Sequence, residues 1–413
     1  MKNDTALWPL EMVEYGNREA MIGEPVIIGG PEISSADLMA ASDVIGRVVS
    51  LLASLPSRTG QTLYDTACWL GFSPAEAEAL TEGCNVLDPK PYARADVIRT
   101  ESGIRLVEIN VGAVVGGAIE GSLPWLAGLD QPQNPMRAWI DYLGQVVPRH
   151  GRGVLVYDGP DGSEWNAHIQ IMAGKIAQIL DMDIVAKCRP QLSWDGTALC
   201  DEKGRFDWLY PVYFPWQVTA NPAYYAPIRA AISNRAVEVP VHPSTLLLAS
   251  KKMLVLLWQC AENGLLSKEE VELVKSAVPF TCSLSTETIA YALDHQQSLV
   301  LKPSNGHCGI GVMVGSEVTL DVWRHELERA IKDSDDDYLL QERCEPILEK
   351  AITIDPAGLR EEYWGRYIWG MFVGNGEFCG TPFMRSRSQE GSLVINCANG
   401  AACGPLSMAS SKC

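Results

Sequence analysis

The spacing of apolar and polar positions predicts a chain that mixes helices with short strands. Apolar residues recur every three or four positions over several segments, as on the buried face of an amphipathic helix. Elsewhere they form short runs bounded by glycine, proline or charged residues, as in buried strands. This alternation indicates an α/β (α+β) fold. The predicted helices span residues 35–55, 61–71, 74–83, 134–147, 164–180 and 250–263, and the predicted strands include residues 153–157 and 183–186.

The clearest local signal is a hairpin near the front of the chain. Apolar runs at residues 97–98 and 104–109 flank Glu101-Ser102-Gly103, a connection with glycine where a left-handed backbone is usually needed. The two runs should therefore pair antiparallel, with Ser102 at the centre. The pairs predicted by that register are Thr100 with Ile104, Ile98 with Leu106, Asp96 with Glu108, and Arg94 with Asn110.

The last two of these pairs place four polar side chains on one face, because residues two apart on a strand point the same way. Two carboxylates and an amide oxygen form the hard oxygen cluster that octahedral Mg²⁺ prefers. The adjacent Arg94 can bind a phosphate or a developing acyl phosphate. The alternative is an amphipathic surface hairpin whose charges are only solvated, and the hairpin alone does not decide between the two.

A second signal lies far downstream, where residues 299–314 read as an apolar strand ending in Lys302 and then a glycine-rich loop. A lysine beside such a loop can clamp nucleotide phosphates, because backbone N–H groups approach closely where no Cβ intervenes. The loop has neither the GxxxxGK[ST] of a Walker A motif nor the GxGxxG spacing of dinucleotide sites. Taken alone, a glycine-rich hairpin turn explains it equally well.

Further strands with polar ends follow the glycine loop. Residues 338–344 form an apolar strand that closes on a Gln-Glu pair, as expected of a segment whose backbone hydrogen-bonds an adenine edge. Residues 365–380 should form two strands around the turn Gly374-Asn375-Gly376. Arg385 and Asn396 lie in another polar stretch.

The order of these parts resembles the ATP-grasp superfamily of carboxylate-amine ligases. That family has a lysine before a helix, a second lysine before a glycine loop, a Gln-Glu hinge, an arginine strand and a metal-binding Glu-x-Asn strand. Here the Asp and Glu-x-Asn hairpin comes first rather than last, which is similar to the circularly permuted, glutathionylspermidine synthetase-like branch. The matching residues are Arg94, Asp96, Glu108 and Asn110 for RxD and Glu-x-Asn, Ser250-Lys251 to Trp258 for Asn-Lys-x6-Trp with serine replacing asparagine, and Gly380 and Arg385 for the late glycine-then-arginine strand.

The resemblance implies an ATP-grasp fold, circularly permuted, with a small Rossmann-like preATP-grasp unit and a helical N-terminal region. It also implies ATP and Mg²⁺ as cofactors, with two metal ions. The roles implied are Asp96, Glu108 and Asn110 on magnesium; Lys251, Lys302, Gly306, Gly309 and Gly311 at the ATP phosphates; Gln341 and Glu342 at the adenine; and Arg94 and Arg385 on the transferred phosphoryl group or acyl phosphate. The branch's usual threonine-proline run after Glu-x-Asn is replaced by Val111-Gly112-Ala113, so the substrate end of the pocket should be rebuilt.

Three regions are expected along the chain: a helical N-terminal region with the hairpin at 1–148, a Rossmann-like substrate unit at 149–245, and the lid and nucleotide-binding core at 246–413. Loops after parallel strands are where such sheets bind ligands. Asp158, Ser163 and Asn166 are therefore substrate candidates, although a simple turn at 158–162 is a slightly better explanation. An aromatic cluster could line a pocket, with core packing the commoner explanation. The members of that cluster are Trp208, Tyr210, Tyr213, Phe214 and Trp216.

Composition limits the classes of partner that this chain is expected to bind. The net charge of −18 argues against nucleic acid, because a phosphate-binding surface needs a basic stripe. We see no apolar run of membrane-spanning length and no apolar signal region at the start, so a cytoplasmic enzyme without a membrane is expected. The 12 cysteines contain no CxxC pair that would indicate zinc or redox chemistry. Cys308 in the glycine loop could be reactive, but an inert small residue is the commoner case.

The function implied is activation of a carboxylate by ATP to an acyl phosphate, followed by attack of an amine to give an amide, ADP and phosphate. The substrates expected are small-molecule carboxylates and amines, and a homodimer is compatible with the sequence. Two alternatives stay open at this point. One is a ligase whose donor or acceptor is tethered to a carrier protein, and the other is a nucleotide-binding protein that has lost catalysis.

Overall fold

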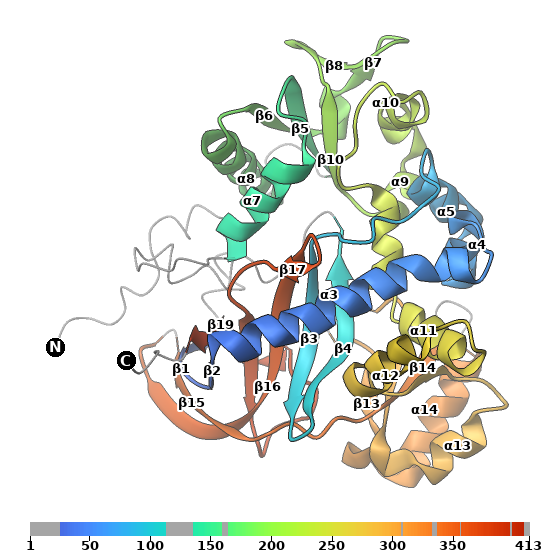
Figure 1. The fold of residues 1–413 in the computed structure, drawn as a ribbon, viewed down its shortest axis with the longest axis vertical. Coiled ribbons are helices and arrows are strands. Elements are labelled where there is room, and N and C mark those ends of the chain that lie inside the picture. The colour runs from blue at the N-terminus through green and yellow to red at the C-terminus, as the bar shows by residue number, and fades with distance from the viewer. Residues whose placement is uncertain are drawn as a thin grey trace.

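The computed structural model describes residues 25–112, 135–158, 164–306, 309–332, 337–355, 357–396 and 399–408. They form a large mixed sheet, a smaller parallel sheet above it in Figure 1, and a four-stranded antiparallel sheet to the lower right. The candidates Ser163 and Cys308 lie outside the described residues, as does the side chain of Asn166.

The large sheet joins strands from the front and the back of the chain. Its strands are β1 (Val26–Gly29), β3 (Ala93–Thr100), β4 (Gly103–Val111), β15 (Glu349–Ile354), β16 (Arg360–Gly374), β17 (Glu377–Phe378), β18 (Phe383–Ser388) and β19 (Ala402–Pro405). Their order is β15-β1-β19-β18-β16-β3-β4, and β15 also pairs with β16, so part of the sheet closes on itself. The early hairpin β3-β4 thus lies against the late strand β16, with which β3 pairs antiparallel. Beside this sheet, β2 (Glu32–Ile33) pairs with β20 (Ser407–Met408).

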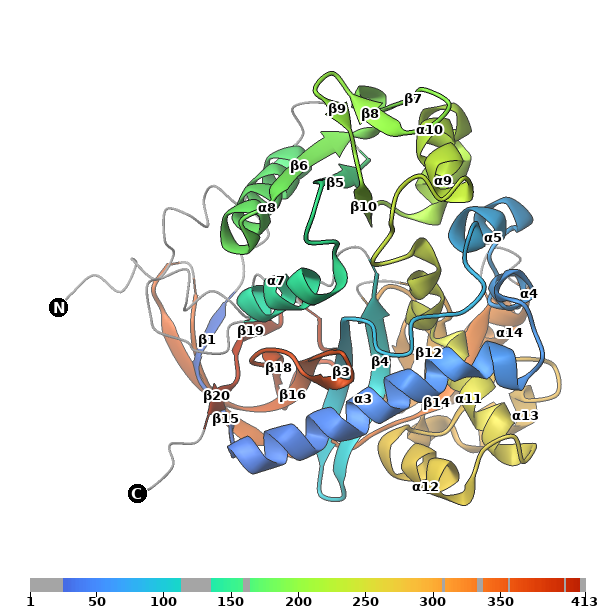
Figure 2. The ribbon, with the colours of Figure 1, turned by 45° about the horizontal axis from the view of Figure 1, so that its top comes forward.

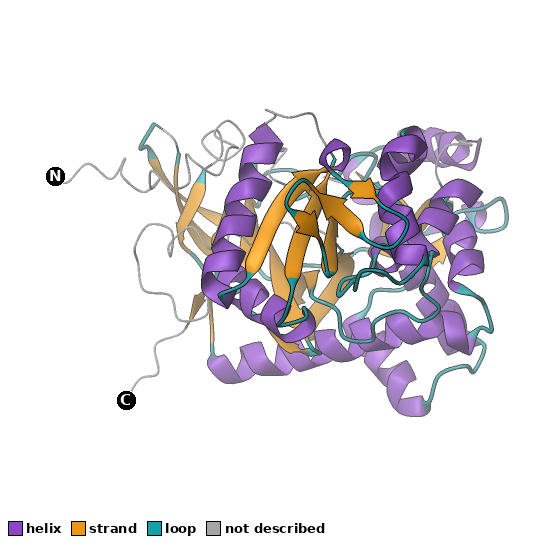
Figure 3. Cartoon of the chain, turned by 90° about the horizontal axis from the view of Figure 1, so that it is seen from above, coloured by secondary structure: helices purple, strands orange, loops and turns teal. Residues whose placement is uncertain are grey.

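The parallel sheet is built from β5 (Arg152–Tyr157), β6 (Asp183–Cys188) and β10 (Trp208–Val212), in the order β10-β5-β6. Helices lie on both sides of it (Figure 3). They are α7 (Pro135–Val146) and α8 (Glu164–Leu180) on one side and α9 (Pro215–Ala220) and α10 (Pro222–Ser233) on the other. A small antiparallel sheet of β7 (Ser193–Trp194), β8 (Leu199–Asp201) and β9 (Gly204–Arg205) follows the turn η3 (Arg189–Gln191). The predicted helix at 164–180 and the two predicted strands are confirmed.

The four-stranded sheet has the order β11-β14-β12-β13 and contains the predicted lysine strand. Its strands are β11 (Thr281–Ser283), β12 (Leu299–Pro303), β13 (Met313–Val314) and β14 (Tyr338–Glu342). The helices and turns around it are η4 (Pro243–Ala249), α11 (Lys252–Glu262), α12 (Lys268–Ala277), α13 (Ile289–Asp294), η5 (Gln296–Ser298), η6 (Gly315–Glu317) and α14 (Leu320–Lys332). Figure 2 shows that this sheet lies beside β4.

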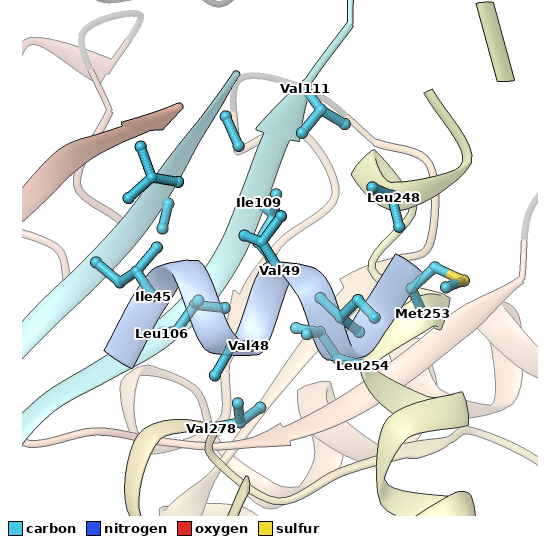
Figure 4. Packing of buried hydrophobic residues seen from close by; sticks show 14 of the residues in the cluster. Ile45, Val48, Val49, Leu106, Ile109, Val111, Leu248, Met253, Leu254 and Val278 are labelled. Carbon is cyan, nitrogen blue, oxygen red and sulfur yellow. The ribbon is translucent and has the colours of Figure 1, made fainter. Parts of the chain in front are cut away.

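The long helix α3 (Ser35–Arg58) crosses the large sheet and forms its main core, with α4 (Leu63–Trp69) and α5 (Pro74–Thr81) following it. Its start is fixed because the Ser34 side chain accepts a hydrogen bond from the backbone N–H of Asp37. Its apolar stripe, including Val48 and Val49, packs on the face of β4 that carries Leu106 and Ile109 (Figure 4). Burial of this stripe joins the early hairpin to the body of the molecule.

Helix α3 also corrects one expectation, that no stretch of the chain has membrane-spanning length and composition. Its most apolar window has a mean hydropathy of 1.6, so by length and composition it could cross a membrane. However, 61% of that window is buried inside the protein, as in the central helix of a folded core. The apolar composition is therefore explained by packing on the sheet.

The hairpin register is confirmed at its base and wrong at its tip. Asp96 faces Glu108 and Arg94 faces Asn110, as predicted. The pairs at the tip are instead Thr100 with Gly103, Arg99 with Ile104, and Ile98 with Arg105. The register shifts by one between Asp96 and Val97, so Val107 is the extra residue of a β-bulge. The bulge lets Leu106 and Ile109, three positions apart, share the core face while Glu108 stays on the other face.

Candidate functional site

A pocket lies between the four-stranded sheet and the hairpin end of the large sheet. Its empty volume is about 990 Å³, including the open solvent at its mouth. The predicted site residues that line it are Asp96, Glu108, Lys251, Lys302, Gly306, Gly309, Gln341, Glu342 and Arg385. Residues from β3, β4, β12, β14 and β18 therefore meet at one place, although they are far apart in the sequence.

Three predicted site residues do not line the pocket directly. Arg94 is 9% exposed and lies behind Asp96, which it contacts. Asn110 is half-buried opposite Arg94 on the hairpin, and its Nδ2 has no hydrogen-bond partner among the described residues. Gly311 packs near Pro303 with φ +74°, so its backbone requires glycine, but it does not reach the pocket wall.

Asp96 is held between two arginines. Arg94 donates to it from Nε at 2.8 Å and from Nη2 at 3.3 Å, and Arg385 donates from Nη2 to its second oxygen. Burial alone would raise the pKa of Asp96, but the charges of Arg385 and Arg94 outweigh burial and hold that pKa below its ordinary value. Asp96 is therefore an anion at neutral pH.

The side chain of Arg94 reaches Asp96 through space left by a glycine. Gly370 on β16 pairs with Asp96, and a Cβ on Gly370 would lie 2.8 Å from Cδ of Arg94. A larger residue there would push the guanidinium group aside. Gly370 is thus part of how the sheet positions the arginine.

Lys251 connects the glycine loop with the hairpin. It lies just before α11 and is 6% exposed. Its Nζ donates to the carbonyl of Gly306 at 2.6 Å and lies 3.4 Å from Oε1 of Glu108. Its backbone N–H donates to the carbonyl of Ser304 at 3.0 Å, which fixes the start of the helix against the loop.

Lys302 forms the second cationic contact of the pocket. Its Nζ donates to Oε1 of Gln341 at 2.6 Å, and Nε2 of Gln341 donates to Oγ1 of Thr281 at 3.2 Å and to the carbonyl of Val107 at 3.4 Å. Burial lowers the pKa of Lys302 to about 8, with Glu108 opposing and Lys251 reinforcing that shift. A ligand with negative charge would restore its full protonation.

The loop after β12 needs glycine for two different reasons. Gly309 has φ +71°, in the left-handed region. A Cβ on Gly306 would lie 2.4 Å from Cγ of Pro303. Glu342 sits at the rim, where its side chain is 53% exposed and lies 3.7 Å from Nη2 of Arg105.

Sequence reasoning missed some residues of the pocket. Arg366 on β16 lines it, donates from Nη1 to the carbonyl of Gly391 at 3.4 Å, and has a buried Nε without a partner among the described residues. Period-two alternation places Arg366 on the same face as Gly370, but only the strand pairing shows that this face meets β12 and β14. Asn396 was noted as polar without a role and also lines the pocket.

The aromatic cluster divides into a buried and an exposed part. Trp208, Tyr210 and Tyr213 are 1%, 2% and 7% exposed and belong to the cores of the parallel sheet. Phe214 and Trp216 are 38% and 44% exposed, and their rings stack with centroids 4.3 Å apart. Core packing therefore explains the first three residues, and the last two lie at the surface.

No family model matches this chain, and no curated protein matches it by sequence. Solved structures do share its architecture. A glutathione synthetase-like effector from Globodera pallida superposes with a TM-score of 0.56 at 12% identity, covering 98% of this chain and 96% of that chain. A protein assigned as a gamma-glutamylcysteine synthetase from Methylobacillus flagellatus superposes with a TM-score of 0.45 at 10% identity, covering 94% of this chain and 90% of that chain.

D-alanyl-alanine synthetase A from Vibrio cholerae superposes with a TM-score of 0.30 at 13% identity, covering 60% of this chain and 89% of that chain. The similarity to the Globodera pallida protein shows that the two chains share a mixed α and β fold.

Proposed function

We propose that this chain is an ATP-dependent carboxylate-amine ligase that forms an amide or peptide bond through an acyl phosphate and releases ADP and phosphate. The observation that carries the proposal is the single pocket in which Lys251, Lys302 and Arg385 face two carboxylates from the early hairpin. Phosphoryl transfer needs such convergence of charge, because neutralisation and alignment do most of the work. The shared fold is consistent with this class of enzyme.

ATP would lie between the two sheets. The two lysines would contact its phosphates, and the glycine loop would approach them with backbone N–H groups. The base would lie on the apolar part of the lining, near the hinge at Gln341 and Glu342. The side chains that form this apolar lining are Ile98, Val107, Val300, Val314 and Ile368.

The polar side chains of the hairpin are of the chemical types that bind magnesium. Asp96 and Glu108 face each other across the strands, and Asn110 carries a buried amide nitrogen without a partner. All three offer the hard oxygens that Mg²⁺ takes, with phosphate oxygens and water as the remaining ligands. When bound, the metal would neutralise charge on the transferred phosphoryl group. Each carboxylate already faces a cation, Arg94 and Arg385 at Asp96 and Lys251 at Glu108, which holds the carboxylates in place.

The two arginines at Asp96 would have different roles. Arg385 lines the pocket and can donate to the phosphoryl group or the acyl phosphate, while Arg94 orients Asp96 from behind. A guanidinium group suits this role because it presents several donors in a fixed plane and stays charged at any working pH.

The circularly permuted order of the ATP-grasp parts is included in the proposal. It is supported by the pairing of β3 with β16 and by the contact between Asp96 and Arg385, which join the first and last quarters of the chain. A hairpin that normally ends such a chain would thus keep its place in the sheet while its sequence position changed.

The test is ADP release from ATP and Mg²⁺ with a panel of amino acids and amines, alone and in pairs. Glu108→Gln should lower ADP formation by about a hundredfold, because the carboxylate charge is lost while the shape is kept. Lys302→Met should weaken ATP binding by about tenfold or more. Matched controls are Glu362→Gln and Lys350→Met, whose side chains are 45% and 57% exposed on the large sheet.

Unchanged magnesium-dependent turnover in Glu108→Gln would contradict the metal assignment. Equal ATP affinity in Lys302→Met and the parent would remove the phosphate role of the lysine. Absence of ADP formation with every pair in the panel, with ATP bound, would favour a nucleotide-binding protein over a ligase.

A further inference from the structure

A second polar cluster lies at the carboxyl edge of the parallel sheet, outside the pocket described above. Asp158 directly follows β5, and Arg189 directly follows β6. Their side chains are 13% and 15% exposed, and Oδ1 of Asp158 lies 2.6 Å from Nη1 of Arg189. Adjacent parallel strands thus end in a carboxylate and a guanidinium group side by side.

Two buried polar groups of this cluster form no normal hydrogen bond among the described residues. The hydroxyl of Tyr225, a residue that is 0% exposed, lies beside the guanidinium group of Arg189 without such a bond. Nε of Arg189 is buried in the same condition, whereas Nη1 of Arg189 is paired with Asp158. Buried donors without acceptors are rare, because each loses its bonds to water on folding. A ligand that brings oxygen acceptors would satisfy both of them.

The same cluster has an aromatic wall. The guanidinium carbon of Arg189 lies 4.6 Å from the ring centroid of Tyr224, and Tyr224 is 51% exposed. The stacked rings of Phe214 and Trp216 come just after β10, at the same edge of the sheet. The exposed ring of Tyr224 beside a buried ion pair suits a ligand that has both charged and apolar parts.

This edge faces the hairpin of the main pocket. In Figure 2 the arrow of β10 points toward the end of β4. The hydroxyl of Tyr210 on β10 donates to the carbonyl of Gly112, the residue after β4, at 3.5 Å. Strand β4 carries Glu108 and Asn110, so the carboxyl edge of the parallel sheet is next to the end of the proposed metal hairpin.

We infer that Asp158, Arg189 and Tyr225 bind an amino acid with an apolar side chain, which serves as the amine substrate; this last step rests on the proposed function. Its carboxylate would accept hydrogen bonds from Arg189 and Tyr225, and its ammonium group would donate to Asp158. Its side chain would lie against Tyr224. A carboxylate and a guanidinium group held side by side are complementary to a zwitterion, and a ligand with one charge would satisfy only half of the site.

The experiment is calorimetric binding to the full chain without ATP. The probes are L-phenylalanine and L-leucine, with 3-phenylpropionate and phenethylamine as ligands that carry only one of the two charges. The parent should bind both amino acids and should bind each single-charge ligand at least about tenfold more weakly. Failure to bind either amino acid would overturn the inference, as would equal binding of 3-phenylpropionate or phenethylamine.

Two variants test the residues, and each has a matched control. Arg189→Gln should weaken amino-acid binding by about tenfold or more, and Tyr225→Phe by about threefold to tenfold. Because Tyr225→Phe removes a hydroxyl without a partner, its thermal midpoint should be equal to or higher than that of the parent, which excludes misfolding. The controls are Tyr213→Phe, whose ring lies 5.0 Å from that of Tyr225, and Arg205→Gln on β9, whose side chain is 72% exposed.

Parental affinity in both Arg189→Gln and Tyr225→Phe would overturn the inference. The binding measurement does not depend on turnover. If no ADP is ever formed but both variants lose amino-acid binding and keep ATP binding, the ligase proposal fails and the amino-acid site stands.

Discussion

At the scale of single residues, Lys302 predicts how stability depends on pH. Its pKa is about 8 in the folded protein, against about 10.4 for lysine in an unfolded chain. Between these two pH values the unfolded state holds more protons, so the contribution of this residue to the free energy of unfolding rises with pH. Relative to Lys302→Met, the parent should therefore gain stability from pH 8 to 10, by about 3 kcal/mol at most. Urea unfolding at several pH values measures the difference.

Other titrating groups do not affect this difference in the free energy of unfolding, because the parent and the variant share them. Lys350→Met, whose side chain is 57% exposed on the large sheet, is the control for the substitution of lysine by methionine itself. A difference that does not change with pH for Lys302→Met would mean that burial does not shift the pKa of Lys302.

Gly370 provides a second test at the residue scale. Alanine there would displace Arg94 from Asp96, because the added Cβ would lie 2.8 Å from Cδ of the arginine. ADP formation should fall by about tenfold or more with little loss of secondary structure, since an aligned donor is lost from the site. Gly174→Ala on α8, where an added Cβ has nothing within 4 Å, is the control and should keep full turnover. Full turnover in Gly370→Ala would show that the position of Arg94 is not critical.

At the scale of elements, helix α3 should be the main source of stability for the hairpin. Leu52 is 0% exposed on this helix, and Met39 on the same helix is 50% exposed. Leu52→Ala should lower the free energy of unfolding by about 2–5 kcal/mol, through lost burial and the cavity that remains. Met39→Ala should change it by about 0.5 kcal/mol or less. Urea denaturation followed by circular dichroism checks both, and similar small effects would argue against α3 as a core helix.

The hairpin shows which features of an element can be predicted from its sequence pattern and which cannot. The paired positions at its base were predictable, because Asp96 and Glu108 lie symmetrically about Ser102 and the tight turn is compensated by the bulge. The paired positions at its tip were not predictable, because a bulge at Val107 leaves no distinct signal in an apolar run. A bulge changes the face of the sheet on which the following side chains lie. That Leu106 and Ile109 lie on the same face is evident only from the core that they share.

At the scale of the whole molecule, the site depends on contacts between distant segments. The sequence order suggested which residues belong together, and the structure brings most of them to one pocket. Arg366 was not identified from the sequence as a pocket residue, and Asp158, Arg189 and Tyr225 were not identified as a cluster. In both cases the proximity follows from strand order and register rather than from spacing along the chain. The local sequence pattern therefore predicted the helices and strands better than it predicted which of them lie next to one another.

The large sheet also predicts the effect of truncation. Strand β19 lies between β1 and β18, so its loss would leave two unpaired edges. A chain ended after residue 401 should aggregate or lose its cooperative unfolding transition, as measured by size-exclusion chromatography and circular dichroism. A chain ended after residue 408, which keeps all described strands, should behave as the parent. A soluble, cooperatively unfolding chain of 401 residues would show that β19 is dispensable.

The pairing of β1 with β19 has a consequence for biogenesis. On the ribosome, β1 emerges long before the strand that lies beside it, so it must wait for a partner made near the end of translation. The parallel sheet, whose strands come from one continuous stretch, can form earlier. The nascent protein should therefore pass through an intermediate in which the parallel sheet is complete and the large sheet is not, and that intermediate is the form on which chaperones would act.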